Sequence, residues 1–165
     1  MRIEHKITRP KQDTNALYGF VLNRSERLTL LAEDDDFLLD GYRVIRNSDI
    51  AEDKETPSTR YCTRIMISES LLSGLDPIPD VDLSDWTTVL GCLKRQQKFV
   101  IVEDESRDVF LIGPILRVNK RSVTIKHFDG TGKWKGEERI IFENITSVSF
   151  DKRYIETHRR HLKHA

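Results

Sequence analysis

The sequence predicts a mainly β protein made of two small five-stranded barrels, with a connecting helix and a short C-terminal helix. Short apolar or alternating runs recur along the 165 residues, and polar or glycine-containing turns separate them. A weak internal repeat points to the same fold, because residues 19–25 (GFVLNRS) are similar to residues 113–119 (GPILRVN). Both copies read as strand, turn, strand, longer connection, strand, and a tight turn into a last short strand. That order is typical of a small five-stranded barrel.

The repeat continues past its first turn with a small change of spacing. LTL at residues 28–30 corresponds to VTI at residues 123–125, and IRNSDI at residues 45–50 corresponds to IIFENI at residues 140–145. The separation is 94 residues before the turn and 95 after it. We therefore expect one residue to be inserted at the tip of the first turn.

Residues 1–56 are expected to form the N-terminal barrel. Alternation at residues 3–8 predicts the first strand, which Pro10 ends because proline cannot donate a ladder hydrogen bond. A tight turn at Asn47 is expected to return Ile50 to the core. Further strands are expected at residues 17–22, 28–32 and 41–46.

Residues 57–83 are expected to be a linker that contains a short helix. Residues 60–72 have helical spacing, although Ile65, Met66 and Ile67 would also suit a strand. The prolines that follow disfavour any longer helix, because proline fixes φ and restricts the residue before it.

Residues 84–165 are expected to hold a helix, the C-terminal barrel and a basic C-terminal helix at residues 154–162. Ser84 is the expected N-cap, since its hydroxyl can accept from a free backbone N–H. The helix should bury one apolar face, formed by Trp86, Val89, Leu90 and Leu93. The strands of this barrel are expected at residues 99–103, 109–118, 123–128, 138–142 and 147–150.

The charges balance over the whole chain but not within its halves. Residues 1–83 hold 11 Lys and Arg against 16 Asp and Glu, and residues 84–165 hold 16 against 11. This asymmetry could provide a basic face for a polyanion, or could let one half dock on the other.

The N-terminus and the cysteines indicate an expected cytoplasmic location. The first residues (MRIEHK) are charged and lack an apolar segment, so no signal peptide is expected. No apolar run approaches the length of a membrane span. Cys62 and Cys92 form neither a C-x-x-C pair nor a disulfide framework.

Two motifs occur once in each half. The first is a glycine-apolar strand, a turn and an apolar strand, at residues 19–31 and 113–125. The second is a strand that bends through a tight turn into the last strand, at residues 42–50 and 140–148. With a helix before the second copy, the chain resembles the Sm-like (LSm and Hfq-like) barrels, part of the wider SH3-like group. The resemblance implies tandem barrels that bind or assemble. The chain also resembles bacterial proteins without an assigned function that carry a DGYxVIR strand and an FxNITSVxF ending.

The chain departs from the Sm-like pattern at the positions that contact RNA. Members that bind RNA present Asp and Asn in the turn of the first motif, where this chain has NRSER at residues 23–27 and VNKRS at residues 118–122. Bacterial members carry a Lys-His pair before the last strand, where this chain has Glu143 and Asn144. Only the Arg46 and Asn47 pair is similar to the family's Arg-Gly. A protein partner or self-association is therefore expected in preference to RNA.

A nucleic-acid site is still a candidate, mainly in the basic second half. Cations can neutralise phosphates, and an exposed tryptophan can stack on a base. The alternative is a solvated basic face with the tryptophan folded over the barrel end. The candidate residues are Arg46, Asn47, Asn119, Lys120, Arg121, Lys126, His127, Lys133 and Trp134.

Two further clusters favour structural explanations. His158, His161 and His164 have a helical spacing that could share a metal, but a basic tail is the expected explanation. The acidic residues 33–36 lack the ligand spacing of a calcium loop and are expected to be a solvated connection. No metal and no cofactor is therefore expected.

The sequence favours a non-catalytic binding or assembly protein. It contains no G-x-S-x-G, H-E-x-x-H, P-loop or G-x-G-x-x-G pattern, and a small-molecule substrate is not expected. The first alternative is an RNA-binding protein that uses the basic C-terminal barrel. The second is an enzyme whose site no motif reveals.

Overall fold

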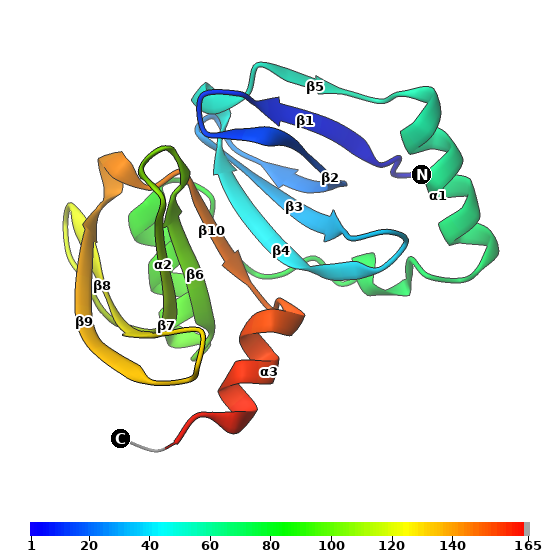
Figure 1. The fold of residues 1–165 in the computed structure, drawn as a ribbon. Helices are drawn as coiled ribbons and strands as arrows, with labels where there is room; N and C mark the ends of the chain where they lie inside the picture. The colour runs from blue at the N-terminus through cyan, green and yellow to red at the C-terminus, as the bar shows by residue number, and fades with distance from the viewer. Residues whose placement is uncertain (164–165) are drawn as a thin grey trace.

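The computed structural model describes residues 1–163 and contains one antiparallel sheet of ten strands (Figure 1). The strand order is β5-β1-β2-β3-β4-β10-β6-β7-β8-β9. The strands are β1 (His5–Arg9), β2 (Asp13–Arg24), β3 (Leu28–Asp34), β4 (Leu39–Arg46), β5 (Glu52–Lys54), β6 (Phe99–Asp104), β7 (Val109–Val118), β8 (Ser122–Phe128), β9 (Trp134–Ile141) and β10 (Ser147–Phe150). The α-helices are α1 (Pro57–Ser68), α2 (Trp86–Arg95) and α3 (Arg153–His161).

The mainly β prediction is confirmed, but two closed five-stranded barrels are not shown. The strands form one continuous sheet, and the sheet is not closed. Its two halves meet where β4 pairs with β10, with Val44 opposite Val148. This pairing uses the outer edge of β4, so each half continues into the other, and the two ends of the sheet are β5 and β9.

Strand pairs in the two halves have corresponding registers. Each half follows one order, β5-β1-β2-β3-β4 in the first and β10-β6-β7-β8-β9 in the second. Thr8 of β1 lies opposite Glu52 of β5, and 95 residues later Glu103 of β6 lies opposite Ser147 of β10. Each last strand follows a one-turn 3-10 helix, η1 (Asn47–Asp49) or η4 (Phe142–Asn144).

The hairpins β2–β3 and β7–β8 share a bulge and a close glycine contact. The register shifts after Val21 in one hairpin and after Ile115 in the other, so both strands bend there. A Cβ on Gly19 would lie 2.5 Å from the carbonyl oxygen of Ala32, and one on Gly113 only 1.9 Å from that of Lys126. Both positions therefore need glycine because a neighbouring backbone passes too close for a side chain.

The change of spacing lies in a later turn than predicted. Val21 is opposite Leu31, and Ile115 is opposite Ile125, so the separation stays at 94 residues across the first hairpin. It becomes 95 in β4 and β9, as η1 and η4 show. The predicted insertion at the tip of the first turn is therefore wrong, and the extra residue belongs to the connection that follows β3 or β8.

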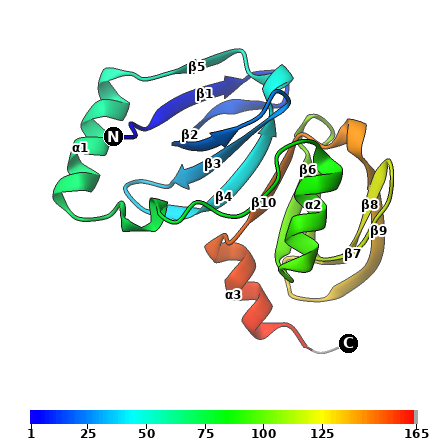
Figure 2. The same ribbon diagram turned by 180° about the vertical axis from the view of Figure 1, so that it is seen from behind.

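Helix α2 provides the centre of the core, and its apolar face is confirmed. Trp86, Val89, Leu90 and Leu93 are buried, in one cluster with strands from both halves. Figure 2 shows α2 in front of the sheet formed by the second half. Asp85 rather than Ser84 caps the helix, because its carboxylate accepts the backbone N–H of Thr88 at 2.9 Å.

Helix α1 resolves the ambiguity between helix and strand in the linker. It begins at Pro57, where proline loses no hydrogen bond, and Thr56 caps it with a hydrogen bond from the N–H of Thr59 at 3.1 Å. The α1 side chains of Thr63 and Met66 are buried, so this face of the helix packs against the first half. In Figure 1 it lies at the outer end of that half, beside the N-terminus.

A buried ionic network joins the two halves. Arg9 is 1% exposed, and its two terminal nitrogens each lie 2.8 Å from a different carboxylate oxygen of Glu105. Glu105 also accepts from the Thr146 hydroxyl at 2.8 Å. Arg43 forms an ion pair with Glu33 and lies 3.6 Å from Glu105. A buried charge needs such partners, so this network constrains how the halves meet.

The helices of residues 1–163 are all too short or too polar to cross a lipid bilayer.

Candidate binding pocket

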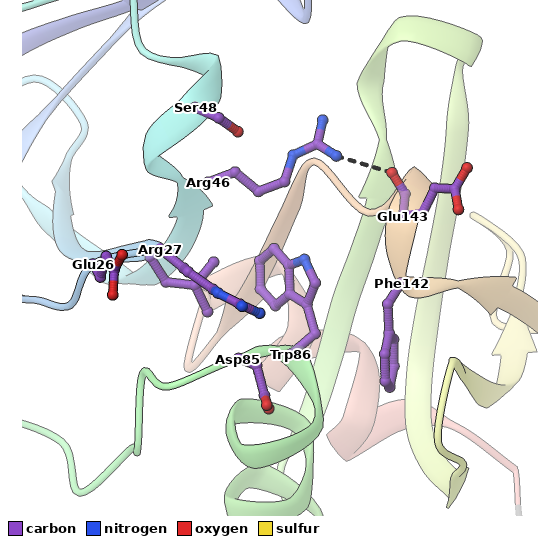
Figure 3. A pocket seen from close by; sticks show the side chains of 9 residues that line it. Glu26, Arg27, Arg46, Ser48, Asp85, Trp86, Phe142 and Glu143 are labelled. Atoms are coloured by element: carbon purple, nitrogen blue, oxygen red, sulfur yellow. Dashed lines mark hydrogen bonds between the residues drawn. The ribbon is translucent and has the colours of Figure 1, made fainter.

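A pocket of about 400 Å³ lies where the two halves and α2 meet (Figure 3). Its residues come from the β2–β3 turn, the end of β4 with η1, the start of α2, and η4. The pocket is lined by Glu26, Arg27, Leu28, Arg46, Ser48, Asp85, Trp86, Phe142 and Glu143.

Arg46, a residue predicted to bind nucleic acid, crosses the rim of this pocket. Its Nε lies 2.7 Å from a carboxylate oxygen of Asp49, and its Nη1 donates to the carbonyl oxygen of Glu143 at 2.9 Å. Figure 3 shows the second bond spanning from the first half to the second. The guanidinium therefore already has partners and serves to hold the two turns together.

Asn47 stabilises the turn below the rim. Its Nδ2 donates to the carbonyl oxygens of Ser25 at 2.9 Å and Glu26 at 3.1 Å, and its Oδ1 accepts from the Thr29 hydroxyl. These bonds use both polar atoms of the side chain, so Asn47 fixes the β2–β3 turn against η1 and does not line the pocket.

The pocket floor is apolar and its rim carries both signs of charge. Leu28 and Trp86 are buried, and Phe142 is partly buried against the same core. Among residues 1–163, Arg27 forms no ion pair, whereas Glu26, Asp85 and the Glu143 side chain provide negative charge at the rim. The arrangement favours an apolar group with polar neighbours over a polyanion.

The other predicted nucleic-acid residues lie on two separate parts of the second half. Asn119, Lys120 and Arg121 form the β7–β8 turn, where the latter two are exposed and form no ion pair with a described residue. None of the three lines the pocket. The structure thus does not gather the predicted residues at one site.

Trp134 is held against its own half of the sheet. Its indole N–H donates to the carbonyl oxygen of Lys163 at 2.8 Å, and its ring packs edge-on against Phe128. The Lys126 ammonium lies 4.3 Å from the ring centroid. The Trp134 ring is therefore packed against its own half, as expected if the basic face is solvated and the tryptophan folds back over the sheet.

His127 and Lys133 flank this region. The Nδ1 of His127 accepts the backbone N–H of Ile112 at 3.1 Å. Lys133 is exposed, and its backbone N–H donates to Asp129 at 3.1 Å in the turn before β9.

The histidines of the last helix and the acidic run take different roles. His158 packs on Phe128 and Tyr154, and it lines a shallow hollow together with His161. His164 lies outside the described residues. Within residues 33–36, Glu33 bonds Lys152 at 2.9 Å as well as Arg43, so this run is only partly the solvated connection that was predicted.

Sequence reasoning missed one group of ligating side chains and most of the pocket. Glu4, Asp34 and Cys62 bring their ligand atoms within 4.8 Å of one another. They are far apart in the chain and carry no spacing motif. Of the residues that line the pocket, only Arg46 was predicted as a binding residue. The similarity of the turn motifs in the two halves was the signal that could have pointed to Arg27 and Phe142 as further lining residues.

Comparison of the chain with models of protein families, with curated proteins and with solved structures gives no match.

Proposed function

We propose that this chain is a non-catalytic binding and assembly protein whose copies associate head to tail through strands β9 and β5. The pairing of β4 with β10 is the observation that carries the proposal. In their own halves β4 and β9 occupy corresponding positions, as do β10 and β5. The junction inside the chain pairs the outer edge of β4 with the outer edge of β10. The corresponding edges, on β9 and β5, lie at the two open ends of the sheet. Unpaired N–H and C=O groups at such edges invite another strand.

The register of the internal junction specifies the register between chains. Arg43 lies opposite Ser149 in the β4–β10 pair. Because the two halves are offset by 95 residues here, Arg43 of β4 corresponds to Glu138 of β9, and Ser149 of β10 corresponds to Lys54 of β5. The proposed contact therefore places Glu138 of one chain opposite Lys54 of the next. The adjacent position places Arg139 opposite Asp53. Both pairs join opposite charges, which stabilise a cross-strand contact.

The two halves are, in this proposal, copies of one small Sm-like or SH3-like unit. The support is the common strand order, the common hairpin bulge and the matching registers described above. A head-to-tail contact between such units either closes into a ring or continues as a filament.

The pocket at the junction provides the binding function in this proposal. Its apolar floor and mixed rim would receive one apolar side chain of a protein partner, with the rim charges bonding the adjacent peptide groups. Substituting Phe142 with Asp would place a charge on that floor. Loss of partner binding without loss of self-association would support a separate role for the pocket.

RNA is the second candidate ligand, and one observation favours it. Lys120 and Arg121 are exposed and unpaired among the described residues, at the turn that corresponds to the Arg27 turn of the first half. RNA carried through purification would raise the ratio of absorbance at 260 to 280 nm, and a high-salt wash would lower it. A low ratio before the wash would contradict this candidate.

Charge exchange at the proposed contact tests the assembly. The measurement is the dissociation constant by sedimentation equilibrium for wild type, Lys54→Glu, Glu138→Lys and the double variant. Each single variant puts like charges opposite each other and should weaken association by about tenfold or less, because one cross-strand pair contributes ~0.2–1 kcal/mol. The double variant should recover most of the loss.

Lys120→Glu is the matched control, since it changes an exposed cation in a turn outside the contact. It should leave the dissociation constant unchanged. A wild-type chain that sediments as a 19.3 kDa monomer at micromolar concentration would contradict the proposal. Equal effects of the two single variants and the double variant would contradict the register.

A further inference from the structure

Three side chains from distant parts of the first half meet beneath α1. Glu4 lies just before β1, Asp34 ends β3, and Cys62 is on α1. Their ligand atoms lie within 4.8 Å of one another, and the Cys62 thiol donates to Asp34 Oδ2 at 3.2 Å. We name these residues the Glu4–Asp34–Cys62 group.

Two carboxylate oxygens of the group are buried without a partner. Glu4 is 3% exposed, and its Oε2 has no hydrogen-bond partner among the described residues. Asp34 Oδ1 is equally buried and equally unpaired. An unpaired buried carboxylate oxygen costs free energy, so its presence points to a ligand that completes it.

A cavity of about 310 Å³ opens on the group. All three residues line it, and the other lining residues are Tyr18, Asp36, Phe37, Ser58 and Thr59. Glu4 is therefore reached from the cavity although its own surface is almost wholly covered. A small ion could enter here and keep a water molecule on the cavity side.

Burial and neighbouring acidic groups raise the pKa of two side chains of the group. Burial raises the pKa of Glu4 to about 7, and the neighbouring Asp34 carboxylate adds to the rise. Burial also raises the pKa of the Cys62 thiol far above its usual range, with Glu4 and Asp34 acting in the same direction.

We propose that the Glu4–Asp34–Cys62 group binds a zinc ion, with a solvent molecule from the cavity as the fourth ligand. Zinc accepts thiolate and carboxylate ligands together, whereas calcium and magnesium take oxygen ligands. With bonds of about 2.0 to 2.3 Å, tetrahedral ligands lie roughly 3.5 Å apart, so small side-chain rotations bring the three atoms into place. Three protein ligands and one open position are the arrangement of a site that can also bind an exogenous group.

Binding exchanges a proton for the metal. The Cys62 S–H bond breaks, its electron pair forms the bond to Zn²⁺, and the proton passes to buffer, with a second proton leaving any protonated Glu4. The metal then neutralises two of the three negative charges. The ion would also tie α1 to β1 and β3, because each element contributes one ligand.

Cobalt(II) and zinc titrations of chelator-treated full-length protein test the site. Co²⁺ should produce the near-ultraviolet thiolate-to-metal absorption, and Zn²⁺ should remove it with a stoichiometry of one. Cys62→Ser should abolish the absorption and weaken zinc binding by about 100-fold, since it removes a ligand. Cys92→Ser is the matched control, because this other half-buried cysteine lies on α2, away from the group.

A measurement on the wild-type chain tests the site even if the Cys62→Ser variant does not fold. Zinc should slow alkylation of Cys62 by iodoacetamide in the native protein, while the rate at Cys92 stays the same. Absence of the absorption in wild type, its retention in Cys62→Ser, its loss in Cys92→Ser, or equal protection of both cysteines would each overturn the proposal.

Discussion

Replacing Arg9 with Met should lower the free energy of unfolding, because it breaks the buried ionic network between the halves. Met keeps most of the apolar volume of the Arg stem but removes both bonds to Glu105. The Glu105 carboxylate would then be buried with only Thr146 and the more distant Arg43 as partners. Removing one member of a buried ion pair costs about 3–5 kcal/mol, so the free energy of unfolding should fall by that amount at pH 7.

The loss should shrink as the pH is lowered. Burial alone would raise the pKa of Glu105, but the Arg9 bonds and charge, with Thr146 and Arg43, lower it below its ordinary value. A lowered pKa contributes stability that is present above the ordinary value of 4.5 and is lost as the pH falls towards the folded-state value. In Arg9→Met burial prevails, Glu105 takes up a proton more readily, and the deficit against wild type becomes smaller near pH 5.

Urea unfolding at pH 7 and at pH 5 measures both effects, with unchanged m-values as the check on two-state behaviour. Arg9→Met combined with Glu105→Leu removes the unpaired charge and should recover most of the loss. A cost below about 1 kcal/mol at pH 7, or the same cost at both pH values, would refute the assigned role of the ion pair.

Four further substitutions test local features of the fold. Gly113→Ala should destabilise by about 3 kcal/mol or more in urea unfolding, because its Cβ would lie 1.9 Å from a carbonyl oxygen, whereas Gly91→Ala in α2 should stabilise by about 0.5–1 kcal/mol. Asn47→Ala should cost about 1–2 kcal/mol through its lost turn bonds, visible as a lower Tm. Thr56→Ala should cost about 1 kcal/mol by removing the α1 cap, and an unchanged Tm would contradict that cap.

Four strands of the second half could be predicted to within one residue at each end, but β9 begins at Trp134, four residues before the predicted start, and ends at Ile141. Val109–Val118 and Ser147–Phe150 have the predicted bounds, because apolar alternation and turn residues mark both ends of such strands. The apolar face of α2 was equally visible in the spacing of Trp86, Val89 and Leu90. Local pattern determines these features, so one sequence is sufficient for them.

The joining of the halves could not be predicted in this way. Val44 meets Val148 across more than a hundred residues, and either strand would read the same in a closed barrel or in a continuous sheet. The choice between Ser84 and Asp85 as cap depended on competing bonds, because Asp85 accepts the N–H of Thr88 whereas the Ser84 hydroxyl donates to Asp82. Local pattern does not contain these long-range or competing contacts.

The candidate sites were the least predictable part. The pocket gathers Arg27, Trp86 and Phe142 from three distant segments, and each alone reads as an ordinary turn or core residue. The Glu4–Asp34–Cys62 group likewise follows only from the packing of α1 on the sheet. The internal similarity of the halves was the one sequence signal that pointed to corresponding turns.

Disulfide cross-linking between β5 and β9 tests the proposed assembly most directly. The two strands are at opposite ends of the sheet within one chain, so cysteines at positions 54 and 138 can join only different chains. Directly opposite antiparallel residues have Cα atoms about 4.5–5.5 Å apart, within disulfide range.

The measurement is non-reducing electrophoresis after oxidation of Lys54→Cys/Glu138→Cys, with Cys62 and Cys92 replaced by Ser. We expect a ladder of covalent oligomers from this chain and none from the matched Lys54→Cys/Lys120→Cys chain. A single monomer band from both chains would contradict the proposed assembly.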